Sequence, residues 1–268
     1  MGLVVCLLVG LTALVFGSTL AYLTRRGGQV QVSHFGLPDL LTGGTLACFF
    51  IGVMVQSISG QSGPPAPPSI DQLLPGQVLV LAIVASLASF LIYRHLNPAR
   101  VFGFTRLSLG GTIGCAVVFL LAALPVVGLT NQLTMLMLRD LATEQDLVGL
   151  FRKLSRENDL EAIGKAFLAT VILAPACEEF LFRGYFYGVG KRYLGGLGSA
   201  LAVSLLFAAF HLNLAALPGL FVLALCLTAA YERTGSLFVP IGMHAIYNCT
   251  SLVILYLQAQ GKLSGFPS

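Results

Sequence analysis

The chain has 268 residues, of which 56% are hydrophobic and only 10% are charged, and its mean hydropathy is +0.88. Water-soluble domains carry about 25% charged residues, so this composition excludes an ordinary soluble enzyme and indicates a polytopic membrane protein. The formal net charge is +4. Its Lys and Arg residues are scattered between apolar runs and form no basic patch, so we expect no nucleic acid partner.

Apolar runs bounded by charged residues, Gly and Pro predict an all-α bundle of about eight transmembrane helices. The expected spans are 2–24, 38–58, 73–94, 107–128, 162–187, 197–213, 215–231 and 236–257. The first run lacks a basic region before it and is long for a signal peptide, so we interpret it as a retained helix. The six cysteines form no CxxC pair, and we expect neither a disulfide framework nor a cysteine metal site.

The pattern of charge divides the chain into four parts. Residues 1–130 contain about four transmembrane helices, 131–161 form an amphipathic segment expected to lie along the membrane interface, 162–258 form a helical core, and 259–268 form a short tail. If the spans alternate, the basic residues of the short loops all fall on one side. Cytoplasmic loops carry the Lys and Arg excess, so we expect the N-terminus outside the cell.

Ionisable residues inside spanning helices are costly and are therefore candidates for function. In the fifth span Glu178 and Glu179 are adjacent, and Arg183 follows Glu179 by four residues. This spacing predicts an ion pair between Glu179 and Arg183, which would fix the helix and the local field. Glu178 points about 100° away from that pair. A purely structural ion pair is the alternative, but two carboxylates beside one arginine leave an excess negative charge.

Two histidines lie in later spans. His211 ends the run from Phe207, and His244 precedes Asn248 by four residues, so His244 and Asn248 share a helical face. A rise of about 1.5 Å per residue places Glu178, His211 and His244 at similar depths, about 15–20 Å from the basic turns. We therefore expect them to meet near the middle of the membrane, in a site that opens toward the cytoplasm.

These residue types suit the hydrolysis of a peptide bond. Glu178 with His211 can hold and activate a water molecule. The amide of Asn248 and the imidazole of His244 can stabilise the oxyanion that develops on the peptide carbonyl. Two other histidines, His34 and His95, fall in expected loops, where we assign them no role.

Other functions remain open on these residues. Glu178, His211 and His244 also make up a catalytic zinc set with one position left for water, although the sequence has no HExxH motif. Zinc is therefore an alternative cofactor. A non-catalytic membrane protein is the alternative class, as an immunity factor, a scaffold, or an ion- or proton-coupled transporter. Transporters often contain paired repeats, and the sequence shows no convincing repeat.

Three motifs, in this order, resemble those of one known family. They are Glu178-Glu179-x-x-x-Arg183, Phe207-x-x-x-His211 and His244-x-x-x-Asn248. They look like the signatures of the CAAX protease and bacteriocin-processing family (Abi, or type II CAAX prenyl endopeptidase-like) of intramembrane proteases. The resemblance covers about 165–255 and implies a glutamate-type or metal-dependent endopeptidase. Its substrate would be a membrane-associated peptide or protein, with lipid-anchored ones included, cleaved by the water and oxyanion groups assigned above.

Overall fold

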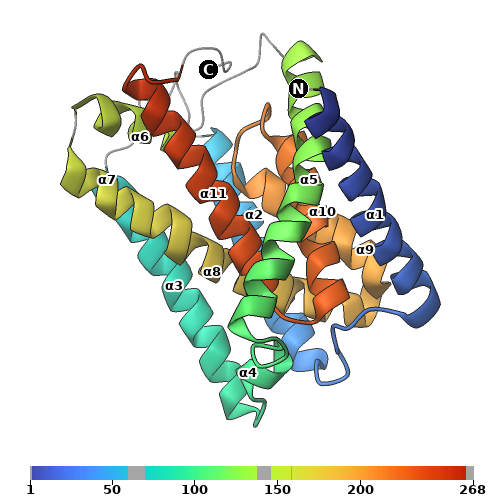
Figure 1. Ribbon diagram of the computed structural model, residues 1–268. Helices are drawn as coiled ribbons and strands as arrows, with labels where there is room; N and C mark the ends of the chain where they lie inside the picture. Colours follow the sequence, from blue (N-terminus) through green and yellow to red (C-terminus); the bar gives the residue numbers. More distant parts are fainter. Residues whose placement is uncertain (1, 60–69, 138–145, 158, 264–268) are drawn as a thin grey trace.

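The computed structural model describes residues 2–59, 70–137, 146–157 and 159–263, and within these ranges it contains helices and no strand (Figure 1). The elements are α1 (Gly2–Arg26), α2 (Leu37–Ser59), α3 (Ile70–Tyr93), α4 (Pro98–Val101), α5 (Leu109–Met137), α6 (Asp146–Glu157), α7 (Leu160–Phe167), the π-helix η2 (Leu168–Leu173), α8 (Ala174–Glu179), the π-helix η3 (Phe180–Phe186), α9 (Tyr187–Phe210), α10 (Leu217–Thr234) and α11 (Phe238–Ala259). The expected all-α membrane bundle is confirmed.

In the described ranges, six helical stretches are long and apolar enough to cross a membrane. The longest, Leu160–Phe210, has 51 residues, but Gly195 within it has a φ of 74° and breaks the helix. The Ser199 hydroxyl donates a hydrogen bond of 3.0 Å to the Tyr187 carbonyl oxygen, so the chain reverses at Gly195 into two antiparallel arms. The two arms can each count as a span, and α10, which packs against α5 and α9, can be added to them. The number of possible spans in the described ranges is then close to the eight expected from the sequence.

The region between the N-terminal helices and the core differs from the sequence expectation in one respect. α5 ends at Met137 rather than at 128, so the segment expected along the interface begins as part of a spanning helix. Within that segment α6 is amphipathic, because Leu150 and Phe151 are buried against α11 while Arg156 is exposed. Its position at the membrane interface stays a prediction, and residues 138–145 lie outside the described ranges.

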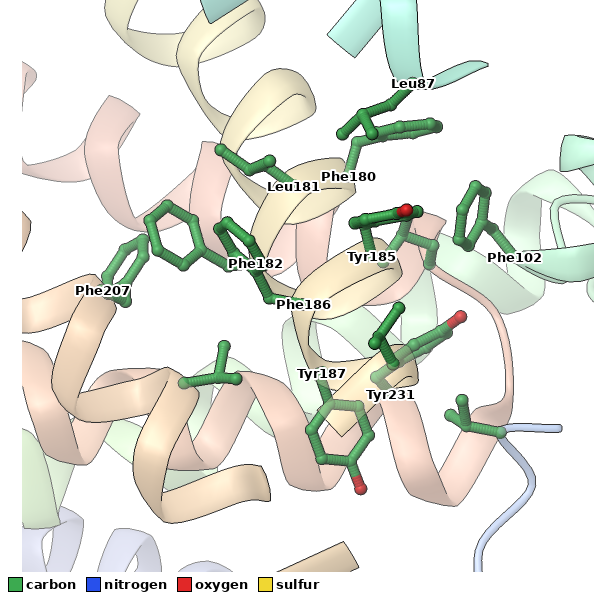
Figure 2. Packing of buried hydrophobic residues seen from close by; sticks show 14 of the residues in the cluster. Leu87, Phe102, Phe180, Leu181, Phe182, Tyr185, Phe186, Tyr187, Phe207 and Tyr231 are labelled. Atoms are coloured by element: carbon green, nitrogen blue, oxygen red, sulfur yellow. The ribbon is translucent and has the colours of Figure 1, made fainter. Parts of the chain in front are cut away.

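The core of the bundle surrounds η3. Every residue of η3 is buried, and its aromatic side chains pack against residues from α3, α9 and α10. Figure 2 shows Phe182 beside Phe207 of α9, and Tyr187 near Tyr231 of α10. The helix that carries Glu178 and Glu179 therefore runs directly into the best-packed part of the molecule.

Basic residues of several short loops lie at one end of the bundle. The start of α1 and the end of α11 lie at one end and α4 lies at the other (Figure 1). At the α4 end Arg94 pairs with Asp39, and Lys191 pairs with Glu232. The sequence placed these basic residues on one side, and the structure agrees. That this end faces the cytoplasm stays a prediction.

Candidate active site

Glu178 and Glu179 end α8, a short α-helical stretch between the π-helices η2 and η3. The hydrogen bonds of a π-helix span five residues rather than four, and π-turns are frequent at functional sites. The widened turns on both sides change the angular position of the side chains that follow. No feature of the sequence predicted these two π-helices.

Glu179 is fully buried and receives two partners on one oxygen. Its Oε1 accepts a hydrogen bond of 2.9 Å from Nη1 of Arg183, which is the expected ion pair. The same Oε1 lies 2.9 Å from Nδ1 of His244 on α11. An ionised carboxylate only accepts hydrogen bonds, so we assign the proton to Nδ1 of His244. Glu179 thereby fixes both the tautomer and the orientation of His244.

The ring of Phe207 connects the three motifs. The guanidinium carbon of Arg183 lies 4.2 Å from its centroid, a cation–π contact that stabilises a cation buried among apolar groups. The rings of His211 and His244 lie 4.9 Å and 5.9 Å from the same centroid. Figure 2 shows Phe207 facing Phe182 of η3, whose centroid is 5.2 Å away. Phe207 therefore holds one residue of each motif in contact with a single ring.

His211 lies at the end of α9, where the helix stops. Its Nδ1 is 2.9 Å from the carbonyl oxygen of Phe207, and because that oxygen only accepts, we assign a proton to Nδ1. In the neutral ring Nε2 then carries a lone pair. The next residue, Leu212, has a φ of 52°, a conformation that is unfavourable for a side chain of this size and that turns the chain sharply after the histidine.

Asn248 contacts the helical segment that leads to Glu178, but at η2, before α8 begins. Its Nδ2 donates a hydrogen bond of 3.0 Å to the carbonyl oxygen of Thr170, in η2. The amide group has two N–H bonds, so one remains for another acceptor. His244 and Asn248 share a face of α11, as expected, and this face reaches the helix of Glu178 at two levels, Glu179 and Thr170.

Glu178 is half-buried, and in the described ranges it forms neither a hydrogen bond nor an ion pair. From the sequence, Glu178 and His211 are expected to share a water molecule. The two side chains make no direct contact among the described residues. A water molecule that bridges them stays a prediction.

Residues 162–250 match the protein-family model described as Type II CAAX prenyl endopeptidase Rce1-like. This segment is Rce1-like. The match confirms the family recognised from the three motifs, and the Rce1-like segment contains all six expected site residues, Glu178, Glu179, Arg183, His211, His244 and Asn248.

One curated relative of the chain is an Escherichia coli protein named "Uncharacterized 24.3 kDa protein", which is 36% identical over 109 residues, or 39% of this chain and 49% of that protein. The chain therefore spans about half the length of the relative that it matches. No solved structure matches the chain.

The zinc alternative depends on whether three ligands of the Rce1-like segment converge. Among the described residues, no group of three or more His, Cys, Asp or Glu side chains is placed to hold one metal ion. Nδ1 of His244 is also engaged by Glu179. Glu178, His211 and His244 therefore do not converge on one metal position among the described residues.

Two residues of the Rce1-like segment that contact the site were not among the expected site residues. Phe207 belongs to a motif, and its place four residues before His211 was a usable signal. Thr170 takes part through its backbone carbonyl, and no side-chain pattern reveals such a contact.

Proposed function

We propose that this protein is an intramembrane endopeptidase that hydrolyses a peptide bond of a membrane-associated substrate by direct attack of water. The observation that carries the proposal is the buried Oε1 of Glu179, which binds Arg183 of its own motif and His244 of another. Phe207, which belongs to the remaining motif, contacts both Arg183 and His244. The Rce1-like match supports the same activity.

Glu178 and His211 are the residues for the attacking water. Neutral His211 directs Nδ1–H to the Phe207 carbonyl, which leaves the Nε2 lone pair to accept a hydrogen bond from water. Glu178 accepts the proton as the water oxygen bonds to the peptide carbon. The same proton then goes to the leaving amine as the C–N bond breaks, so no covalent acyl-enzyme forms.

Asn248 and His244 are the residues for the oxyanion. The second N–H of the Asn248 amide is free of Thr170 and can donate to the developing negative charge. His244 donates through Nε2 when its ring is protonated, while its Nδ1–H stays on Glu179. Glu179 and Arg183 are positioning residues, because they act through His244 and the helix rather than on the substrate.

The substrate class follows from the membrane setting and from the family description. A site near the middle of the bundle suits a peptide segment within or at the bilayer, and the words "CAAX prenyl" in that description favour a lipid-anchored peptide or protein. Access from the cytoplasmic side, with the N-terminus outside, completes this proposal.

The test is cleavage of a membrane-anchored reporter peptide library by the purified full-length protein in lipid vesicles. Glu178→Gln and His211→Gln should each lower cleavage about 10²–10⁴-fold, the usual contribution of a general base. Glu161→Gln is the matched control, because Glu161 is an exposed partner of Lys165 on α7 and should cleave like wild type. Retained cleavage with a chelator supports water activated by Glu178 and His211 without a metal.

Two outcomes would overturn the proposal. One is a wild-type protein that cleaves no member of the library, which shifts the function to transport or scaffolding. The other is a Glu178→Gln variant as active as Glu161→Gln. Loss of wild-type cleavage with the chelator would instead assign the water to a metal.

A further inference from the structure

A pocket of about 300 Å³ opens at the α4 end of the bundle, away from the residues of the candidate active site. Three segments form it: the chain after α1, the chain from the end of α3 through α4, and the turn between α10 and α11. Small-molecule sites commonly occupy about 300–1,000 Å³, so this pocket suits a small polar group.

The lining of this pocket is cationic and polar. Arg100 and Arg106 supply its positive charge. The rings of His34 and His95 and the amides of Gln29, Gln31 and Asn97 supply its other polar groups. No Asp or Glu is among the lining residues. The two carboxylates next to the lining segments are already neutralised, because Asp39 pairs with Arg94 and Glu232 pairs with Lys191. The pocket therefore favours an anion.

One wall is fixed by a buried network around Glu232. Its Oε1 accepts hydrogen bonds from the Tyr187 hydroxyl and from Lys191, and its backbone carbonyl accepts from the Gln29 N–H at 2.8 Å. Lys191 also donates to the Val30 carbonyl at 3.0 Å. These bonds hold residues 29 and 30 against α9 and α10, so the wall does not depend on a ligand for its shape.

The opposite wall is fixed by two glycines with positive φ. Gly103 and Gly235 both have a φ of 67°, and a Cβ on Gly103 would overlap the Gly235 carbonyl oxygen. The Leu237 N–H donates to the Phe102 carbonyl at 3.0 Å, which locks the two turns together. Arg106 lies over Gly235 and reaches the side-chain oxygen of Gln29 at 3.3 Å, so its guanidinium is held across the pocket.

Two further observations indicate a ligand. Nε2 of His34, which lines the pocket, is buried and has no hydrogen-bond partner among the described residues. His95, also in the lining, adopts a φ of 59°, and such unfavourable backbone conformations in residues other than glycine concentrate at ligand sites. Neither histidine has a role that the sequence predicts, because both lie in loops that come together only in the folded chain.

We infer that this pocket binds the phosphate group of an anionic phospholipid. Arginine guanidinium groups form paired hydrogen bonds with phosphate oxygens, and basic pockets between transmembrane helices bind such headgroups. The membrane source is favoured over a soluble phosphate because exposed apolar residues adjoin the lining segments: Leu37 begins α2, Tyr93 ends α3 and Leu109 begins α5. These side chains suit contact with the acyl chains of the same lipid.

The experiment measures thermal unfolding of the full-length protein, purified in a neutral detergent, against increasing dihexanoyl phosphatidylglycerol. A ligand of the folded state raises the unfolding midpoint in a saturable way. The double variant Arg100→Gln/Arg106→Gln should lower the apparent affinity at least about tenfold, the effect of losing one charge-assisted hydrogen bond. Arg100→Gln alone should give part of this loss. Arg100 is exposed, and its side chain makes no hydrogen bond or ion pair in the described ranges, so its variant tests binding without a folding defect.

The matched control is Arg25→Gln/Arg192→Gln, which removes the same charge from exposed residues outside the pocket. It should bind like wild type. Three results would overturn the inference: equal loss of affinity in both double variants, no saturable shift for wild type, or inorganic phosphate binding as tightly as the lipid. The last result would assign the pocket to a soluble phosphate compound. None of these outcomes depends on proteolytic activity.

Discussion

Nδ1 of His244 lies 2.9 Å from Oε1 of Glu179, although the two residues are 65 positions apart in the chain. This contact connects α11 to the end of α8, and it joins the ion pair with Arg183 on the same carboxylate oxygen of Glu179. Each motif is thus incomplete without the other, and the predictions for the site start from this pair.

Replacing Glu179 with Gln should destabilise the protein by about 3–5 kcal/mol, because it leaves the fully buried Arg183 without a counter-charge. Chemical unfolding in detergent measures this change. The double variant Glu179→Gln/Arg183→Met should recover much of the loss, since no isolated charge remains. A double variant as unstable as the sum of the single changes would show that the two residues act independently.

Replacing Phe207 with Leu should reduce both stability and cleavage. The substitution removes the cation–π contact with Arg183, worth about 0.5–2 kcal/mol, and the ring contacts that position His211 and His244. Unfolding midpoints and cleavage rates measure the two effects. Phe49→Leu is the control, because Phe49 is exposed on α2. A Phe207→Leu variant that cleaves like Phe49→Leu would remove the ring from the site.

Replacing Asn248 with Ala separates an oxyanion role from a structural one. As an oxyanion donor, Asn248 should contribute about 10²–10³-fold to kcat, whereas its hydrogen bond to Thr170 accounts for only about 1 kcal/mol of stability. Cleavage kinetics should therefore show a fall in kcat with KM little changed. Thr170→Val keeps the backbone carbonyl and should remain close to wild type. A loss of stability without a loss of kcat would make Asn248 a helix-packing residue.

Acid should destabilise the protein through His34. Burial lowers the pKa of His34 below its ordinary value of 6.5, Asp39 opposes this effect, and Arg94 adds to it. The unfolded chain binds a proton near its ordinary pKa while the folded chain resists it, so stability falls as the pH drops below about 6.5. Unfolding measured from about pH 7 to about pH 5 should be less pH-dependent in His34→Gln than in wild type. An unchanged pH dependence would contradict this assignment.

Replacing Gly235 with Ala should destabilise the turn between α10 and α11. Its φ of 67° is unfavourable for a residue with a Cβ, which alone costs about 1–2 kcal/mol, and the added atom would also meet Arg106. Gly10→Ala is the control, since nothing lies within 4 Å of a Cβ there and Ala favours the helix by about 1 kcal/mol. Equal stability of the two variants would show that the turn is not constrained.

The sequence was sufficient for the parts of the structure that depend on local patterns. Apolar runs placed most span boundaries within a few residues, although α5 continues to Met137 and the fifth span continues to the break at Gly195. The four-residue spacing of Glu179 and Arg183 predicted their ion pair. Contacts between distant elements were not predictable in this way. The contact from His244 to Glu179 required the packing of α11 against α8, and the sequence analysis assigned His244 to the oxyanion without finding its support.

Glu232 shows why a charge can be overlooked. It lies beside Arg233 at the end of α10, where an acidic residue next to a basic one suggests solvent-exposed neighbours. In the structure Glu232 is buried and Arg233 instead stacks on the Tyr22 ring, 4.1 Å from its centroid. Its partners Lys191 and Tyr187 come from α9, so only the folded chain shows that this carboxylate is paired.

The π-helices on either side of Glu178 and Glu179 have a consequence for how this helix tolerates changes in length. A π-turn closes its hydrogen bonds one residue later than an α-turn, so deleting one residue from η2 or η3 can leave a continuous α-helix. In η3, such a deletion before Arg183 would rotate the guanidinium by about 100° around the helix axis, away from Glu179. The contact between Glu179 and Arg183 therefore depends on the number of residues between them as well as on their identity. A chain shortened by one residue here would keep its helix and lose this contact.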